Sequence, residues 1–256
     1  MKSNEKKGRP LLFSIMLGIA LTLLVVVAST VATILELNDT GIMIAQGVAF
    51  FIMAVIVTVY MMKRDRSLEQ FGFKKLDGRR ERKALYYIPL LIIALIQPLF
   101  GGFNLELSLT EVCIIVIFSL FVGYTEESVF RGIIKERLQI KGPVFYIVFS
   151  SIFFGILHMA NAFNGEDILQ TVSQVINAFL IGIILALLIE LTQNIIPLIA
   201  FHFLYDALAL MTNPDNVDKE LLVLFILNIL YLVYGIYLVY ALMRKRKVAN
   251  TWQGLN

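Results

Sequence analysis

The stretch that decides the fold reads Val112-Cys-Ile-Ile-Val-Ile-Phe-Ser-Leu-Phe-Val122 and leads into Thr125-Glu-Glu-Ser-Val-Phe-Arg131. An apolar run of this kind is typical of a helix that is embedded in lipid or deeply buried. Charged side chains are costly in such a place, so they usually line a cavity and pair with one another. The two carboxylates after the run, Glu126 and Glu127, are therefore the first functional candidates.

The overall composition indicates a membrane protein. Hydrophobic residues make up 59% of the 256 residues and charged residues 16%, against about 45–50% and about 25% in an ordinary soluble domain. A membrane-spanning helix needs about 20 apolar residues. We therefore expect an all-α fold, a polytopic membrane helix bundle with about eight transmembrane helices. The candidate spans are 11–35, 41–62, 84–100, 110–134, 143–160, 168–190, 195–212 and 220–243.

Other features of the sequence refine this expectation. The third and seventh spans are short, and Pro98 is expected to end the third because proline interrupts a helix interior. Cys113 is the single cysteine and lies within an apolar run, so we expect a small core residue and no disulfide framework. No internal repeat is visible. Residues 1–256 are expected to form one membrane domain, with the catalytic core over 110–212.

Basic residues favour one side of the predicted membrane. Residues 63–83 contain nine Lys or Arg and four Asp or Glu, and further basic clusters occur at 2–9, 135–141 and 244–247. The alternate connections contain few or no cations. The positive-inside rule makes the basic side cytoplasmic, which places both termini in the cytoplasm. We expect these clusters to contact anionic lipids and not nucleic acid.

The spacing of charges in the fourth span separates Glu126 from Glu127. Glu127 and Arg131 are four residues apart, so they share one helix face and can form an ion pair. Glu126 points about 100° away from Glu127 and has no evident partner on its own helix. Glu126 is therefore the candidate for chemistry, and Glu127 and Arg131 are the candidates for structural support.

Both histidines of the chain are predicted to lie within spans and near the depth of Glu126. A hairpin folded between the fourth and fifth spans places Glu126 and His158 at the same height, about 24 Å from the turn. Glu126 then lies about 13 Å below the level of Lys135, and His202 lies about 12 Å in from the same side. Asp206 follows His202 by one helical turn, so the two can act together on one face.

Other residues of the spans have simpler explanations. Gln170, Gln174 and Asn177 share a face of the sixth span and are expected to form interhelical hydrogen bonds. Phe154 precedes His158 by one turn and is expected to serve packing. These residues are not candidates for chemistry on the sequence alone.

Two kinds of chemistry fit a buried glutamate near two histidines. The carboxylate can act as a general base on water. Alternatively, Glu126, His158 and His202 match the three protein ligands of a catalytic site for a divalent metal such as zinc, with water as the fourth ligand. Both arrangements perform hydrolysis, and the sequence leaves open whether a metal takes part.

Three motifs around these residues resemble those of the CPBP family, the CAAX proteases and bacteriocin-processing intramembrane proteases related to the Rce-type prenyl-protein protease. Family members show Glu-Glu-x-x-x-Arg, Phe-x-x-x-His and His-x-x-x-Asn/Asp, in this order and on separate spans. Here the motifs read Glu126-Glu127-Ser-Val-Phe-Arg131, Phe154-Gly-Ile-Leu-His158 and His202-Phe-Leu-Tyr-Asp206.

The resemblance implies an intramembrane endopeptidase that cuts membrane-embedded or lipidated peptides or proteins near the cytoplasmic interface. It implies that Glu126 activates the attacking water with help from His158, and that His202 and Asp206 stabilise the oxyanion. In the prenyl-protein branch the last motif position is Asn. Asp206 can donate a hydrogen bond only when it is protonated. The family's branches imply either CAAX-type substrates or roles in peptide maturation and self-protection against bacteriocins.

Two other classes of function fit the same residues. A proton-coupled transporter could use the acids and histidines as a relay, although we see none of the repeats that transporters often carry. A non-catalytic membrane scaffold or immunity factor could keep the fold without cleaving peptide bonds.

Overall fold

Eight α-helices of 14 residues or more form the bundle in the described part of the protein, which comprises residues 9–75, 84–164, 168–213 and 220–253 of a computed structural model. The helices are α1 (Pro10–Ile34), α2 (Asp39–Arg64), α4 (Ile88–Gly101), α5 (Leu109–Glu127), α7 (Pro143–Leu157), α8 (Ile168–Thr192), α9 (Ile196–Leu210) and α10 (Glu220–Gln253). Six of them are long and apolar enough to cross a membrane. The two shorter apolar helices are Leu85–Gly101, which includes α4, and Ile196–Leu210, which is α9. The predicted all-α bundle of about eight spans is confirmed.

Local sequence explains where six of these helices begin. Ser108 and Glu111 form a capping box at α5: the Ser108 hydroxyl accepts from the Glu111 N–H at 3.3 Å, and the Glu111 carboxylate accepts from the Ser108 N–H at 2.8 Å. The Asn38 side chain caps α2 by accepting from the Gly41 N–H at 2.9 Å. Helices α1, α4, α7 and α9 have proline in the first turn, where its missing N–H costs little.

Two expectations about single residues were wrong. Helix α4 continues through Pro98 to Gly101 and stops at Gly102, whose φ is 74°. The proline removes a single N–H from the ladder, the one that would donate to the Ala94 carbonyl, so the helix can continue past it. Cys113 is exposed on α5 and does not belong to the core. An apolar neighbourhood is a poor guide here because membrane helices are apolar toward lipid as well as toward the protein interior.

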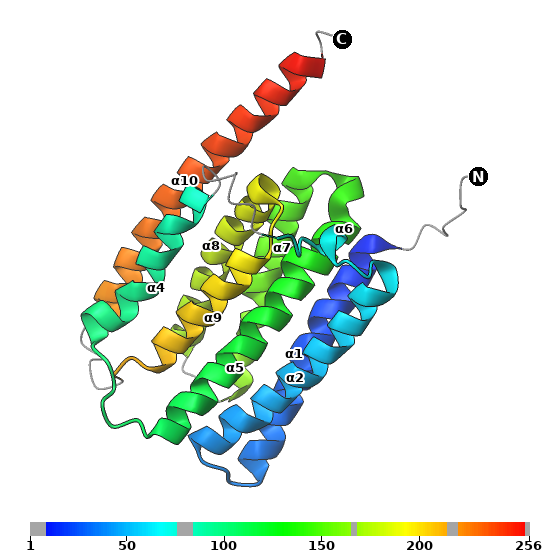
Figure 1. Cartoon of the computed structure of the whole chain (residues 1–256). Helices are drawn as coiled ribbons and strands as arrows, with labels where there is room; N and C mark the ends of the chain where they lie inside the picture. Colours follow the sequence, from blue (N-terminus) through cyan, green and yellow to red (C-terminus); the bar gives the residue numbers. More distant parts are fainter. Residues whose placement is uncertain (1–8, 76–83, 165–167, 214–219, 254–256) are drawn as a thin grey trace.

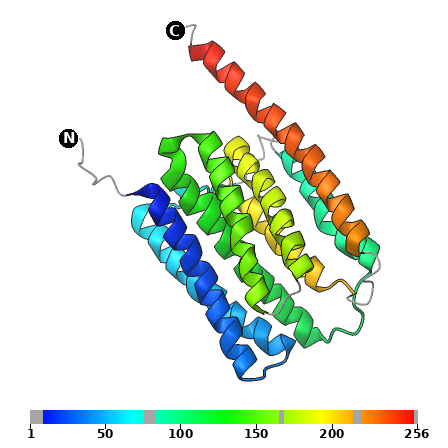
Figure 2. The same ribbon diagram turned by 180° about the vertical axis from the view of Figure 1, so that it is seen from behind.

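The helices form a central group with a pair on each flank (Figure 1). Helices α1 and α2 pack together on one flank and α4 and α10 on the opposite one, as the view from behind also shows (Figure 2). In the centre, α5 packs against α2 and α9, and α7 packs against α8. The helices that carry the three motifs are therefore all in the central group.

Two glycines let the central helices approach each other closely. A Cβ atom on Gly123 of α5 would lie 2.8 Å from the backbone nitrogen of Phe203 on α9. A Cβ atom on Gly155 of α7 would lie 3.0 Å from the carbonyl oxygen of Val175 on α8. Small residues at such crossings bring helix backbones together. The crossing at Gly123 is adjacent to His202, so it sets the distance between that histidine and α5.

The basic segments gather at one end of the bundle (Figure 1). The start of α1, the end of α2, the short helix α6 (Lys135–Leu138) and the last part of α10, which extends beyond the other helices, all lie at this end. This arrangement agrees with the sequence, in which connections rich in Lys and Arg alternate with connections that contain few or no cations. That this end faces the cytoplasm stays a prediction.

Candidate active site

The helical conformation changes directly after the two glutamates of the first motif. The chain is α-helical through Glu127, forms a π-helix over Ser128–Ile134, and continues into α6 and the 3-10 turn Gln139–Lys141. All seven side chains of the π-helix are buried. Because π-helical turns are rare and frequently occur at functional sites, this one favours a functional site at the centre of the bundle.

Glu127 is completely buried and joins two partners through one oxygen. Its Oε1 accepts hydrogen bonds from Arg131 Nη1 at 3.0 Å and from His202 Nδ1 at 2.9 Å. The ion pair expected from the sequence spacing is therefore present. Because an ionised carboxylate only accepts, Nδ1 is the nitrogen of His202 that carries the proton. Glu127 thus orients His202, a contact between helices that the sequence did not indicate.

The second ring nitrogen of His202 lies near two further carboxylates. Nε2 is 3.7 Å from Glu126 Oε2 and 3.5 Å from Asp206 Oδ2. Both distances exceed those of a strong hydrogen bond, so Nε2 can engage a third group in the site. Three carboxylates therefore surround one imidazole. Glu126 lies near His202, which agrees with the similar depth expected for the two residues.

His158 stands where α7 ends and the 3-10 helix His158–Asn164 begins. Its Nδ1 lies 2.9 Å from the carbonyl oxygen of Phe154. A carbonyl can only accept, so Nδ1 donates and Nε2 keeps the free lone pair. Carbonyl groups in the last turn of a helix lack an intrahelical partner, which explains why this local bond forms.

The ring of Phe154 connects the charged groups of the site. Its centroid lies 4.8 Å from that of His158 and 6.3 Å from that of His202, in edge-to-face geometry in both cases. The guanidinium carbon of Arg131 lies 4.6 Å from the ring centroid, within the range of a cation–π contact. Phe154 is 3% exposed. Phe154 packs as expected, and the residues it contacts, His158, His202 and Arg131, belong to the three motifs.

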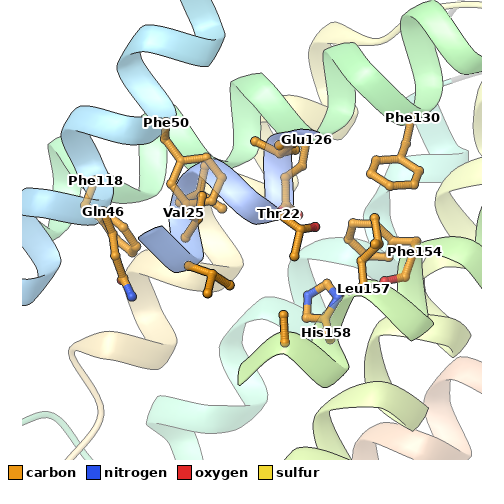
Figure 3. Close-up of a pocket in the computed structure, with 14 residues that line it drawn as sticks. Thr22, Val25, Gln46, Phe50, Phe118, Glu126, Phe130, Phe154, Leu157 and His158 are labelled. Carbon is orange, nitrogen blue, oxygen red and sulfur yellow. Dashed lines mark hydrogen bonds between the residues drawn. The ribbon is translucent and has the colours of Figure 1, made fainter. Parts of the chain in front are cut away.

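Two cavities adjoin at His158. The first has a volume of about 230 Å³ and is lined by Glu126 and His158 together with side chains of α1, α2, α5 and α7 (Figure 3). The second has a volume of about 630 Å³ and is lined by His158, His202 and Asp206. The side chains that line both cavities are Phe118, Phe154 and His158. Residues from three separate motifs are thus brought together around one junction.

Comparison with known protein families gives a match over the part of the chain that carries the three motifs. Residues 108–208, from the cap of α5 into α9, match the family of the type II CAAX prenyl endopeptidase, Rce1-like. This stretch, which is less than half of the chain, is similar to the Rce1-like endopeptidase family. The resemblance seen in the three motifs is thereby confirmed. No curated protein and no solved structure matches the chain.

The matched family is one of intramembrane proteases, so the match indicates a peptidase acting on a protein or peptide substrate. Together with the six long apolar helices and the two shorter ones, it makes the chain a multi-pass integral membrane protein.

The site, as it stands, does not fit a metal ion. Within the described residues, no group of three His, Cys, Asp or Glu side chains is arranged so that it could hold one. A zinc ion needs its ligand atoms about 2.0–2.2 Å away in tetrahedral array. Glu126, His158 and His202, the set expected from the sequence, share the site without forming such an array.

The site also contains polar residues that were not expected from the sequence. Gln97 of α4 and Ser173 of α8 line the second cavity beside Gln174 and Asn177. A signal for Gln97 was available, because it is the only polar side chain in α4 and a lone polar group in a membrane helix usually faces the interior. The side chain of Gln170 lies outside the described residues.

Proposed function

We propose that the protein is an intramembrane endopeptidase that hydrolyses peptide bonds of membrane-associated peptides or proteins near the cytoplasmic interface. One observation supports the proposal beyond the family match: Glu126, His158 and His202 face two adjoining cavities that share His158 as a wall. A carboxylate and two imidazoles are thereby available to one peptide bond at the junction.

In the proposed reaction Glu126 is the general base. It takes a proton from a water molecule while the water oxygen bonds to the carbonyl carbon of the scissile peptide. His158 positions this water by accepting a hydrogen bond at Nε2, because its Nδ1 is held by Phe154. A well-placed general base contributes about 10²–10⁴-fold to the rate.

The carbonyl oxygen becomes an oxyanion, and His202 stabilises it. Glu127 holds the Nδ1 side of the ring, so Nε2, when protonated, can donate to the oxyanion. Removing one such donor typically lowers kcat by about 10²–10³-fold. Asp206, with Oδ2 at 3.5 Å from Nε2, orients the ring, and it donates a hydrogen bond itself only when protonated.

The carbon–nitrogen bond then breaks, and Glu126 returns its proton to the departing nitrogen. The products are a carboxylic acid, which ionises, and an amine, so one water molecule is consumed and no other reactant is required. Glu127 and Arg131 hold the site together without touching the substrate.

We further propose that the basic end of the bundle is cytoplasmic and contacts anionic lipids. The substrate then carries either a CAAX-type lipidated C-terminus or a membrane-embedded segment of a peptide that is being matured. Residues 1–256 act as one domain in this proposal, with the catalytic core over 110–212.

A comparison of two cell lines tests the proposal. Membrane peptides are quantified by mass spectrometry in cells that carry the wild-type protein and in cells that carry Glu126→Gln. Uncleaved substrates are expected to accumulate only with the variant. The purified proteins are then compared in detergent on a peptide found in this way. Glu126→Gln and His158→Ala are expected to lose at least about 10²-fold in kcat.

The matched control is Glu106→Gln, an exposed glutamate in the loop before α5. It should cleave like the wild type. Equal cleavage by Glu126→Gln and the wild type overturns the proposal. A solute flux in liposomes that depends on a pH gradient and on Glu126, without cleavage, would favour a transporter instead. Full biological activity of Glu126→Gln would favour a non-catalytic scaffold.

A further inference from the structure

The second cavity is large enough to hold part of a peptide. Its volume of about 630 Å³ compares with about 230 Å³ for the first and lies within the range of about 300–1,000 Å³ common for ligand pockets. It extends from His158 between α4, α8 and α9. A peptide whose scissile bond lies at His158 would therefore continue into this space.

Two amide side chains line this cavity without a protein partner. Gln97 and Asn177 are half-buried, and neither makes a hydrogen bond to another described residue. An amide side chain offers two donors and an acceptor. Leaving these groups unpaired is unfavourable, so they will bond to whatever polar group enters the cavity. Their chemistry matches the N–H and C=O groups of a peptide backbone and the hydroxyl or amide groups of uncharged side chains.

The charges around the cavity restrict what can enter. Among its described lining residues there is no Lys or Arg, and the charged or chargeable groups nearest the site are His158, His202 and Asp206. Glu126 and Glu127 do not line this cavity, although Glu126 Oε2 lies 3.7 Å from the same His202 nitrogen as Asp206. A carboxylate placed in this cavity would lack a lysine or arginine partner and would be opposed by Asp206. An acidic stretch is therefore disfavoured, and an uncharged polar stretch is favoured.

The first cavity has a different character. Apolar side chains line much of it, among them Leu21, Val25, Val26, Phe50, Val122 and Leu157, beside the polar Thr22, Gln46, Glu126 and His158. It suits an apolar segment of the substrate. The first cavity also has fewer polar side chains than the second and lacks the amides of Gln97 and Asn177.

We infer that Gln97 and Asn177 form a substrate subsite that binds an uncharged polar stretch of a peptide, next to an apolar stretch held in the first cavity. The inference rests on the proposed function and names the chemistry of its substrate. Gln97 and Asn177 determine specificity and take no part in bond breaking.

Three synthetic peptides test this subsite on the full-length protein in detergent. All three share an apolar segment of Leu, Val and Phe, and they differ in the four residues that follow, which are uncharged polar, acidic or apolar. With the wild type, KM for the acidic peptide is expected to be at least tenfold higher than for the uncharged polar one. Gln97→Leu and Asn177→Leu should raise KM for the polar peptide at least tenfold and leave kcat within about twofold.

A variant that binds one peptide better than the wild type does cannot owe its effect to misfolding. Gln97→Arg supplies the missing cation and should lower KM for the acidic peptide at least tenfold while raising it for the polar one. The control is Gln46→Leu, a glutamine in the lining of the first cavity, which should not change the ranking of the three tails. Equal effects of Gln97→Leu on all three peptides, or equal KM values for acidic and polar tails in the wild type, overturn the inference.

Photo-cross-linking separates this inference from the proposed function. A benzophenone group is placed in the polar tail, and the cross-linked residues are located by mass spectrometry. Cross-links to α4 and α8 without cleavage would support the subsite and overturn the peptidase. Cleavage with cross-links elsewhere would overturn the subsite alone. The absence of both cross-links and cleavage with every peptide would overturn the subsite as stated.

Discussion

Glu127 and His202 form a buried hydrogen bond, 2.9 Å from Oε1 to Nδ1, across a separation of 75 residues. The same oxygen accepts from Arg131. The pair that holds α5 to its π-helical continuation therefore also fixes the ring of the histidine on α9. Structural support and the orientation of a site residue are two roles of one carboxylate.

Glu127→Gln is expected to lower kcat by about 10²-fold, because an amide cannot hold the Arg131 and His202 donors as one ionised oxygen does and the oxyanion donor loses its orientation. KM should change little, since Glu127 does not line either cavity. Steady-state kinetics on a cleaved peptide measure both. Glu69→Gln, an exposed glutamate near the end of α2, is the control. An unchanged kcat would contradict the orienting role.

Arg131→Met should reduce stability by about 3–5 kcal/mol, because it leaves the buried Glu127 carboxylate without its cation. It also removes the contact with the Phe154 ring. Thermal unfolding in detergent measures the change. Arg64→Met is the control, since its pair with Glu136 is 4.0 Å long and its side chain is 34% exposed, which predicts an effect below about 1 kcal/mol. If the two variants melt alike, the buried network does not stabilise the fold.

Gly123→Ala is expected to separate α5 from α9, because the new methyl group would lie 2.8 Å from the Phe203 nitrogen. The shift should cost about 1–3 kcal/mol and reduce cleavage, since it moves His202 away from Glu127. Gly235→Ala on α10 is the matched control, because nothing lies within 4 Å of its Cβ position. Wild-type activity of Gly123→Ala would show that this crossing does not set the site.

Phe154→Leu should lower kcat by about 10²-fold, since a displacement near 1 Å of catalytic groups can have that effect. The ring supports both histidines and Arg131, and leucine is smaller and lacks the aromatic face. Phe51→Leu, on the exposed face of α2, should leave kcat unchanged. Rescue by Phe154→Tyr would support a role of the aromatic ring, and equal activity of the two leucine variants would argue against it.

The stability of the turn after α2 is expected to depend on pH. The backbone N–H of Gln70 and the side chain and N–H of Ser67 donate to the Asp65 carboxylate and lower its pKa. The folded pKa is therefore below the unfolded value of about 3.9. The stabilisation is complete above the unfolded pKa and is lost as pH falls through the folded one.

Hydrogen exchange of the Gln70 amide, corrected for the intrinsic rate, measures this change. Asp65→Asn should remove the pH dependence. The turn leads to Gly72, whose carbonyl accepts from the Ile195 N–H at 2.9 Å just before α9, so the exchange of Ile195 should follow. A wild-type Gln70 amide that stays protected at low pH would contradict the prediction.

Much of the molecule follows from local sequence. Runs of apolar residues specify where the helices lie, because a span must satisfy its own backbone hydrogen bonds in lipid. Prolines and the Ser108–Glu111 box specify where several of them start. The Glu127–Arg131 pair follows from a spacing of four residues on one helix. The three motifs then suffice to suggest the family.

The tertiary structure alone decided the contacts between helices. The bond from Glu127 to His202, the central place of the Phe154 ring and the lining role of Gln97 depend on how α4, α5, α7 and α9 pack. The exposure of Cys113 was missed for a related reason: helices in lipid are apolar on all sides, so hydrophobicity does not distinguish the face toward lipid from the face toward protein. By itself the sequence determined which residues carry charge within the spans, whereas packing decided which of them meet, because interhelical contacts are set by shape and not by spacing along one helix.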